Sequence, residues 1–264
     1  MPELPEVQTI VSGLQKLIHK EIKNVSIYTP IIVNSKKPLD KLLINDEFSH
    51  ISRHGKYIKL ITIKQTKLLI HLRMTGQLII QTQSEFKPDK HTHIRIDFVN
   101  GLQLIYRDIR KFGRWTLIPA DKDFSDYINA GEDALSIQLS EFKKLLQKNP
   151  NKLIKAFLLD QTKIAGIGNI YVDEICFDLG VLPTSKLSQT NPQKLLNSIQ
   201  KILTSAIKNN GTTFSDYLTS EGKLGNFQNL LCVYHQKSCP KCGKQIQKNK
   251  VSGRSTHYCA YCQK

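Results

Sequence analysis

Four cysteines near the end of this 264-residue sequence constrain its fold more than any other feature. They form two pairs, Cys239-x2-Cys242 and Cys259-x2-Cys262, separated by sixteen residues. This spacing is typical of a tetrahedral zinc site with four thiolate ligands. The last ~35 residues are too short for an apolar core of their own, so metal would have to supply one. Because four protein ligands leave no open position, we predict one structural zinc ion, not a catalytic one.

The other two cysteines, Cys176 and Cys232, lie in apolar stretches, where packing is the expected role. No apolar run approaches the ~20 residues of a membrane span. Glu3 and Glu6 occupy what would be the positive region of a signal peptide. We therefore expect a cytoplasmic protein with no membrane partner, in which thiols stay free. Four zinc ligands and two packing residues then fit better than three disulfides, and a redox dithiol fits poorly because two pairs are present.

The charge balance favours a polyanionic partner. Lys and Arg number 38 against 22 Asp and Glu, a formal net charge of +16. A generally Lys-rich proteome is the alternative explanation, but the basic residues are not evenly spread. Residues 222–264 contain eight Lys or Arg and no Asp or Glu. Since each lysine–phosphate contact releases counterions, we predict a nucleic-acid partner.

The other end of the sequence suggests a nucleophile. A small residue at position 2 lets an aminopeptidase remove Met1, which would expose the secondary amine of Pro2. Apolar residues then repeat at helical spacing, so we predict a helix over 5–20 with the amine just ahead of it. Glu3 and Glu6 lie close to that amine. A free amine flanked by carboxylates can attack carbon and exchange protons, which indicates an enzyme.

Between the two ends the predicted secondary structure changes once, from strands to helices. Short branched-residue runs predict strands at 57–63, 67–72, 77–81, 93–99 and 102–106. Asn100-Gly101 is a strong hairpin turn signal between the last two. Many short strands with little helix favour a sandwich or barrel over residues 1–130. A polar linker at 121–132 precedes helical patterns at 141–148, 152–159, 170–179 and 193–209.

Several turns carry residues suited to nucleic acid. Gly166 and Gly168 let the chain turn tightly before a helix whose free N–H groups can face a phosphate, although a plain helix connector has the same pattern. Met74 and Phe112 would ordinarily be core residues. Both, however, are expected at turns beside Arg or Lys, where an apolar wedge into a DNA stack would lie. A basic hairpin between the two cysteine pairs would bring Arg254 near a base or phosphate.

Taken together, these residues resemble the formamidopyrimidine-DNA glycosylase family over essentially the whole chain. The segments PELPEV, GKY, HLRMTG, RKFG, GIGNIY and the cysteine tail with GRSTHYC occur in the family's order. Leu4 within PELPE is more similar to the 8-oxoguanine branch than to the endonuclease VIII branch. The resemblance implies an α+β fold: an N-terminal catalytic β-sandwich domain with a leading helix (1–130), a helix-two-turns-helix domain (131–228) and a zinc-finger β-hairpin (229–264).

The resemblance also implies a reaction and assigns roles. A monomer would bind damaged double-stranded DNA, remove oxidised purines through a Schiff base, and cleave the abasic site by β- and δ-elimination without an organic cofactor. The implied catalytic residues are Pro2, Glu3, Lys56 and Arg254, with Glu6 ordering the site and Glu174 supporting it. The implied DNA-binding residues are Met74, His91, Arg110, Phe112, Lys155, Asn169 and Tyr171. The implied zinc ligands are Cys239, Cys242, Cys259 and Cys262.

Two alternatives stay open: the same scaffold acting on oxidised pyrimidines, and a zinc-dependent binding module without catalysis. Some positions depart from the family's commonest pattern and bear on base preference and loop order. They are Ile109, Asn210, Ser215, His235 and Gln236. The glycine-containing stretch 208–231 is expected to be a loop that closes over an extruded base.

Overall fold

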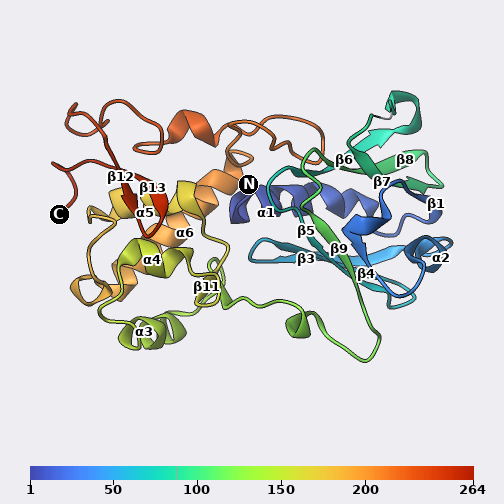
Figure 1. The fold of residues 1–264 in the computed structure, drawn as a ribbon, viewed down its shortest axis with the longest axis horizontal. Coiled ribbons are helices and arrows are strands. Elements are labelled where there is room, and N and C mark those ends of the chain that lie inside the picture. The colour runs from blue at the N-terminus through green and yellow to red at the C-terminus, as the bar shows by residue number, and fades with distance from the viewer. Residues whose placement is uncertain (88) are drawn as a thin grey trace. The chain divides into compact units, whose positions relative to one another are not determined.

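The structure is a computed structural model that describes residues 1–87 and 89–264. The chain divides into two compact units (Figure 1). The N-terminal unit comprises Met1–Asn129 and Asn210–Asn226, and the C-terminal unit comprises Ala130–Asn209 and Phe227–Lys264.

Within the described residues, no helix has both the length and the apolar character needed to cross a membrane.

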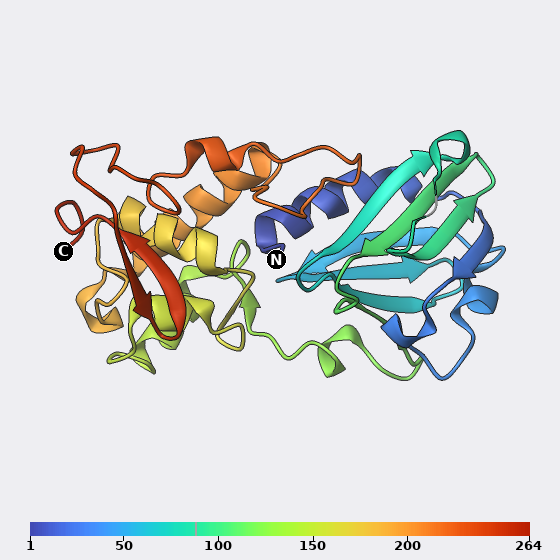
Figure 2. The ribbon, with the colours of Figure 1, turned by 45° about the horizontal axis from the view of Figure 1, so that its top comes forward.

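Two sheets form the N-terminal unit (Figure 2). The first has the order β1 (Ile22–Ile27), β7 (Thr92–Phe98), β8 (Leu102–Asp108) and β6 (Gly76–Thr82). The second has the order β2 (Val33–Asn34), β9 (Arg114–Ile118), β5 (Lys67–His71), β4 (Tyr57–Thr62) and β3 (Phe48–His54). Neighbouring strands are antiparallel except β2 and β9. Buried residues alternate along strands such as β4, as expected for a sheet with one face on a core.

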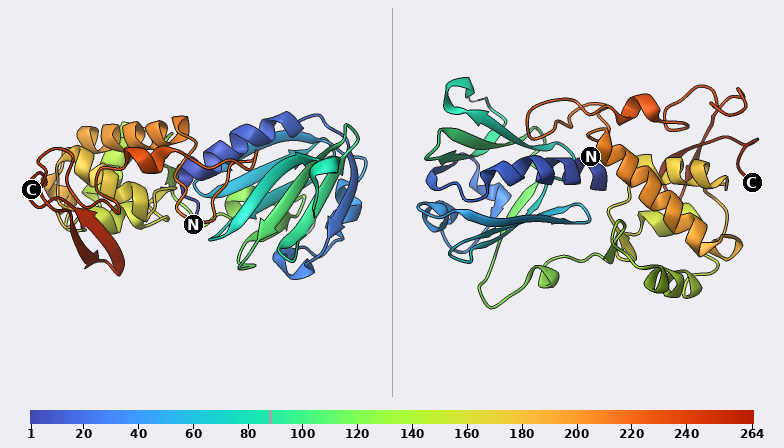
Figure 3. Two further views of the ribbon diagram at one scale, coloured as in Figure 1. Left: turned by 90° about the horizontal axis from the view of Figure 1, so that it is seen from above. Right: turned by 180° about the vertical axis from the view of Figure 1, so that it is seen from behind.

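The leading helix α1 (Leu4–Leu14) contributes its apolar side to the same core as both sheets (Figure 3). It is shorter than the predicted 5–20, because a 3-10 turn at Gln15–Leu17 ends it before β1. The predicted turn at Asn100-Gly101 is confirmed, with Gly101 at φ +83° between β7 and β8. Short helical turns at Pro30–Ile32, Leu39–Leu43 (α2), Gln83–Glu85 and Phe124–Asp126 connect the strands.

Residues 210–226 pack within the N-terminal unit although they follow the helical region in sequence. The backbone N–H of Ile80, on the edge strand β6, donates to Ser220 O at 2.7 Å. The Gln77 side chain donates to the carbonyl of Asp216. Tyr217 lies in the apolar core of the sandwich. This segment, called the returning loop below, thereby covers one edge of the first sheet.

The C-terminal unit is helical, with α3 (Leu139–Gln147), α4 (Ile154–Leu159), α5 (Asn169–Leu179) and α6 (Pro192–Lys208). Pro192 begins α6, and the Asn191 side chain caps it by accepting from Lys194 N. Gly180, at φ +78°, ends α5 in the left-handed region. The short strands β10 (Glu132–Asp133) and β11 (Ile164–Ala165) pair in parallel. Further 3-10 turns lie at Leu187–Gln189 and Phe227–Leu230.

The C-terminal tail folds as the predicted hairpin, with β12 (Gln247–Val251) paired antiparallel to β13 (Arg254–Tyr258). The predicted α+β class with a β-sandwich, a helical region and a terminal hairpin is therefore confirmed. The boundaries at 130 and 228 stay predictions. The strands β1, β3 and β9 were not predicted; polar residues interrupt the apolar alternation of β1 and β3.

Candidate active site

The start of α1 holds the predicted nucleophile and acids in a fixed arrangement. Glu3 is the N-cap residue, and its N–H donates to Glu6 Oε2 at 2.8 Å. In return the Glu3 side chain accepts from the N–H of Glu6, which completes a capping box. Pro2, Glu3 and Glu6 are all buried. The two carboxylates lie at the positive end of the helix dipole. Pro2 thus precedes an ordered helix end.

Glu6 also anchors the returning loop. Its second oxygen, Oε1, accepts from Thr212 N at 2.8 Å. Gly211 has φ +75°, and a Cβ there would lie 2.7 Å from Glu6 Oε1, so only glycine fits without displacing the carboxylate. Burial, and then the Glu6 charge, raise the pKa of the nearby Tyr217. The Tyr217 hydroxyl donates to Asn210 O at 2.9 Å, which closes the base of the loop. One carboxylate therefore orders both the helix start and the loop.

Lys56 lies in the two-residue turn between β3 and β4 and is only 7% exposed. Gly55, at φ +54°, makes this turn possible. Arg53 connects the turn to α1: its Nε donates to Gln8 Oε1 at 3.0 Å and its Nη1 to Gly55 O at 2.9 Å. The turn bearing Lys56 is thereby fixed to the helix that carries Glu3.

His71, at the end of β5, lies within the electrostatic field of Lys56. Burial first, and then the positive charges of Arg73 and Lys56, lower the pKa of His71 to about 3. Its Nδ1 accepts from Arg73 N at 3.0 Å, and its ring meets Tyr57 edge-on, with centroids 4.6 Å apart. His71 is therefore neutral at physiological pH and can only offer a neutral imidazole to a ligand.

The predicted wedge residues come together at two neighbouring turns. Met74 lies between β5 and β6 and is 41% exposed, and Phe112 lies between β8 and β9 and is 48% exposed. The Arg110 guanidinium stacks on the Phe112 ring at 4.6 Å and lies 3.0 Å from Met74 Sδ. Large apolar side chains held in solvent beside a cation are suited to entering a base stack.

Asp108, which was not predicted from the sequence, holds together the two turns that carry Met74, Arg110 and Phe112, called the wedge below. Its fully buried carboxylate accepts from Gly113 N at 2.8 Å, Arg110 N at 3.2 Å and the Tyr106 hydroxyl at 3.1 Å. The Thr75 hydroxyl, beside Met74, donates to it as well. Burial alone would raise the pKa of Asp108, but these hydrogen bonds outweigh it and lower the pKa. The signal in the sequence that could have identified this residue is its position two residues before the RKFG segment.

His91 is half-buried next to β7, and its carbonyl accepts from Asp108 N at 3.0 Å. Asp108 therefore contacts both parts of the site: its carboxylate holds the turn with Arg110, and its backbone N–H holds His91. Pro2, Glu3, Lys56, Met74, His91, Arg110 and Phe112 all lie in the N-terminal unit.

The other predicted contacts lie in the C-terminal unit, around Ser255 in β13. The Ser255 carbonyl accepts from Asn169 Nδ2 at 2.9 Å and from Lys155 Nζ at 3.0 Å. Lys155 also donates to Asp173 Oδ1 at 2.6 Å, and Asp173 Oδ2 accepts from His257 N at 2.8 Å. This network joins α4, α5 and the hairpin, and so positions the exposed Arg254 one residue before Ser255.

Lys155 and Asp173 are both 0% exposed in this network. The family resemblance implied a DNA-binding role for Lys155, and its buried pair with Asp173 was not predicted. The spacing of Asn169 and Asp173, four residues apart on α5, would have placed both on one helix face. Tyr171 is also fully buried, with its ring 5.8 Å from that of Phe227. The roles of Lys155 and Tyr171 toward DNA stay predictions.

Glu174 fixes the chain that leads into the cysteine tail. Its carboxylate accepts from the backbone N–H groups of Cys232, Val233 and Tyr234 at 2.8, 2.9 and 2.8 Å. Burial raises the pKa of Glu174 and outweighs the opposing effect of these three hydrogen bonds. An acid placed under three consecutive N–H groups determines the path of this segment.

The four predicted cysteines converge. Their sulfur atoms all lie within 4.8 Å of one another, with Cys239 and Cys262 3.8 Å apart and Cys242 and Cys259 3.5 Å apart. A tetrahedron with Zn–S bonds of about 2.3 Å has S···S edges of about 3.8 Å, so the residues fit a zinc ion. Cys176 and Cys232 lie outside the cluster, and Cys176 is fully buried, in accord with a packing role.

Comparison with known proteins identifies the family. Residues 1–115 match the model of the formamidopyrimidine-DNA glycosylase N-terminal domain, residues 131–217 that of its H2TH domain, and residues 237–264 the zinc finger found in FPG and IleRS. The formamidopyrimidine-DNA glycosylase of Ureaplasma parvum is 41% identical over 276 residues and covers all of both chains. This chain belongs to the formamidopyrimidine-DNA glycosylase family.

Solved structures of this glycosylase family agree over the full length. Lactococcus lactis Fpg in a complex with a THF-DNA and an inhibitor has a TM-score of 0.88 and 35% identity, with 100% of both chains covered. The same protein with an abasic-site-containing DNA has a TM-score of 0.88 and 36% identity over 99% of each chain. As a member of the family, the present glycosylase is a bifunctional DNA-repair enzyme, both an N-glycosylase and an abasic-site lyase.

Two of the departures from the family pattern fall where the backbone is left-handed. Asn210 has φ +60° and His235 has φ +58°, positions that favour glycine. Asn tolerates this region, whereas the His235 ring packs at a tilt against those of Tyr234 and His257, with centroid distances of 4.7 and 4.9 Å. These contacts offset backbone strain at His235 in the glycosylase.

Proposed function

We propose that this glycosylase removes oxidised purines, 8-oxoguanine and formamidopyrimidines, from double-stranded DNA and then cleaves the strand at the abasic site. The observation that carries the proposal is the capped start of α1, where Glu3 and Glu6 bond reciprocally directly behind Pro2. In support, a mutant of the similar Lactococcus lactis Fpg has been solved with Fapy-dG-containing DNA, and Lactococcus lactis Fpg has been solved with abasic-site-containing DNA. We further propose that it acts as a monomer in the cytoplasm.

The first step requires removal of Met1, which makes the nitrogen of Pro2 a secondary amine. An ordinary α-amino group has a pKa near 7.7–8.0, so about a tenth is free base at neutral pH, far more than for an ordinary lysine. The target base is inaccessible inside a duplex, so its nucleotide must first be extruded. Met74, Arg110 and Phe112 would fill the space that it leaves, and their stacking would offset part of the cost.

The Pro2 nitrogen would then form a bond to C1′ of the extruded sugar, and the base would leave with the electron pair of its glycosidic bond. Glu3 would protonate the ring oxygen, O4′, as the C1′–O4′ bond breaks to give an iminium ion. The iminium acidifies the hydrogens on C2′. Loss of one of them would expel the 3′ phosphate from C3′, which is β-elimination. The conjugated iminium that results acidifies the hydrogen on C4′, and its loss would expel the 5′ phosphate from C5′, which is δ-elimination.

The remaining residues would hold the DNA. Lys56 would bind the phosphate next to the lesion and assist proton transfer, and Arg254 would approach a phosphate from the hairpin. His91, Lys155, Asn169 and Tyr171 are the further proposed DNA-binding residues. The zinc ion held by Cys239, Cys242, Cys259 and Cys262 would give the hairpin a stable base and take no part in the chemistry.

Borohydride trapping tests the proposal directly. The mature protein, with Met1 removal verified by mass spectrometry, should form a covalent adduct with duplexes containing 8-oxoguanine, and Pro2→Gly should lose it. Glu3→Gln should keep DNA binding and lose turnover. The absence of any adduct from the verified mature protein would refute the Schiff base. Faster cleavage of thymine glycol than of 8-oxoguanine would support the pyrimidine alternative, and full cleavage by Pro2→Gly would reject the mechanism.

A further inference from the structure

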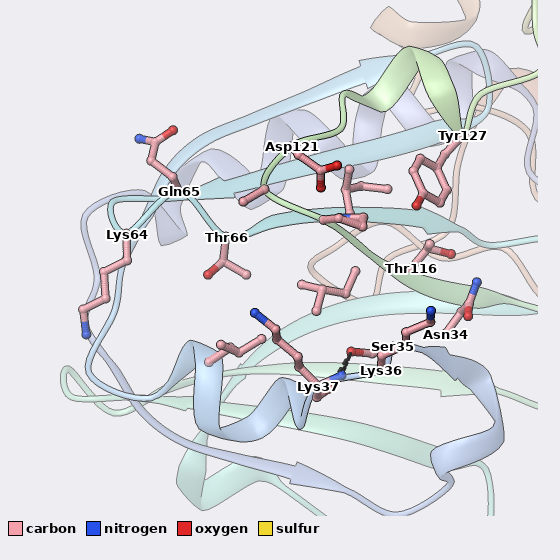
Figure 4. Close-up of a pocket in the computed structure, with 15 residues that line it drawn as sticks. Asn34, Ser35, Lys36, Lys37, Lys64, Gln65, Thr66, Thr116, Asp121 and Tyr127 are labelled. Atoms are coloured by element: carbon pink, nitrogen blue, oxygen red, sulfur yellow. Dashed lines mark hydrogen bonds between the residues drawn. The ribbon is translucent and has the colours of Figure 1, made fainter.

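A hollow on the N-terminal unit takes no part in the site described above. It has a volume of about 690 Å³ and lies between the chain after β2, the β4–β5 turn and the chain after β9 (Figure 4). This volume falls within the ~300–1,000 Å³ range of pockets that bind small ligands or single side groups of polymers.

The charge in this hollow is mostly positive. Lys36, Lys37 and Lys64 line it, against one lining carboxylate, that of Asp121. Figure 4 shows the Lys37 side chain pointing into the hollow and that of Lys64 pointing away. The Lys64 ammonium donates to Asn45 O at 2.7 Å. Within the described part of the chain, the ammonium groups of Lys36 and Lys37 have no hydrogen-bond or ion-pair partner.

The loop that carries these two lysines makes a local turn, in which Lys37 N donates to Ser35 Oγ at 3.1 Å. Apolar side chains line the same space, namely those of Leu42, Leu117, Ile118, Pro119 and Ala120, and Tyr127 adds an exposed aromatic ring. A cationic rim over an apolar and aromatic lining suits a ligand that combines anionic groups with flat apolar faces.

The hollow continues toward the wedge. A second hollow of about 240 Å³ shares Asn34, Thr116 and Tyr127 with the first and is also lined by Arg73 and Arg114. Arg73 directly precedes Met74, and Arg114 follows the Phe112–Gly113 turn. Arg114 Nη1 donates to Lys111 O at 3.0 Å and Gly113 O at 2.8 Å, but within the described residues neither arginine forms an ion pair. Four cations therefore mark a path from the wedge, past Tyr127, to Lys36 and Lys37.

We propose that this path binds a single-stranded segment of DNA that extends from the lesion duplex. Regularly spaced phosphates match cations spread along a path, and a flat base matches the apolar lining and the Tyr127 ring. Paired and stacked bases of a duplex cannot enter a hollow of this size, whereas those of a single strand can. The proposal goes beyond the glycosylase reaction and requires only that the protein binds DNA.

Fluorescence anisotropy with tailed duplexes tests it. Each duplex carries a stable abasic-site analogue and either no tail or a single-stranded tail of about ten nucleotides, placed in turn at each of the four strand ends. We expect one tail position to tighten binding by about tenfold, because even one stacked base is worth that much. Two lysine–phosphate contacts should also steepen the dependence of log K on log salt by about 1.4.

The variant Lys36→Glu/Lys37→Glu should abolish the gain from the tail, and Tyr127→Ala should reduce it. Both should bind and cleave the untailed duplex like the wild type, which separates this site from the reaction. The matched control is Lys20→Glu/Lys23→Glu, which changes the same charge at two exposed positions of the same unit outside the hollow. It should retain the gain.

Three results would overturn the proposal. Tails at all four ends could leave affinity unchanged, the gain could survive in Lys36→Glu/Lys37→Glu, or the control could lose it equally. Binding of a synthetic acidic peptide with apolar residues to the wild type and not to Lys36→Glu/Lys37→Glu, with tails inert, would assign the hollow to a protein partner instead.

Discussion

The buried pair of Lys155 and Asp173 offers the sharpest test of how the C-terminal unit is held together. Both side chains are 0% exposed and their charged atoms are 2.6 Å apart. Asp173 also accepts from the backbone of His257 in β13. Replacement by Asn keeps the shape but removes the negative charge facing a buried ammonium group. Loss of one partner from a buried pair costs about 3–5 kcal/mol, so we expect Asp173→Asn to lower the free energy of unfolding by that amount.

The matched control is Glu141→Gln. Glu141 pairs with Lys144 at 2.8 Å, but the two side chains are 54% and 64% exposed. The distance between charged atoms is similar in the two pairs, but the Glu141–Lys144 pair is exposed to solvent. Glu141→Gln should therefore lower the free energy of unfolding by at most about 0.5 kcal/mol. The double variant Lys155→Met/Asp173→Leu should recover most of the stability lost by Asp173→Asn, because no unmatched buried charge remains.

The assay must report on the C-terminal unit. The single tryptophan, Trp115, lies in the N-terminal unit, so its fluorescence does not follow the relevant transition. Hydrogen exchange of peptides that cover α4, α5 and β13 reports on the unfolding of the C-terminal unit, and circular dichroism in guanidinium gives the free energy of unfolding. A loss below about 1 kcal/mol in Asp173→Asn, with unchanged exchange in β13, would show that the pair does not hold the hairpin to the helices.

Three further predictions concern other parts of the molecule. Cys242→Ser, or chelation of the wild type, should unfold the hairpin and abolish DNA binding, which circular dichroism and anisotropy would detect. The pKa of His71 is lowered to about 3 by burial first, so its unfolded form binds a proton below about pH 6.5 and its folded form does not. Stability should therefore fall as pH falls from about 6.5 to 3, and less so in His71→Gln; equal pH profiles in denaturant unfolding would contradict this. Gly211→Ala should expose the returning loop to proteolysis through its clash with Glu6, at a cost of about 1–3 kcal/mol. Gly222→Ala is the matched control: its φ of +73° is similar, but an added Cβ would meet no atom within 4 Å, so it measures the cost of backbone strain without the clash.

Local sequence patterns were sufficient to predict those parts of the structure that are held by interactions between residues close in sequence. The cysteine spacing predicted the sulfur cluster, because each Cys-x2-Cys pair closes its own turn. The turn at Asn100-Gly101 was predicted for the same reason. The wedge residues were expected at turns from their sequence neighbours, and Met74 and Phe112 are exposed there. Strands such as β3 and β9 escaped prediction, since their burial depends on which face meets the core.

By itself, then, the sequence determined the cysteine cluster, the helix behind Pro2 and the family, because each depends on residue types at short, fixed spacings. Only the tertiary structure decided that Glu6 bonds to Thr212 across more than half the chain. It also decided that Lys155 lies buried against Asp173 and Ser255. Such contacts form when distant segments are brought together by burial of their apolar neighbours, and no local pattern encodes which partner a buried charge will meet.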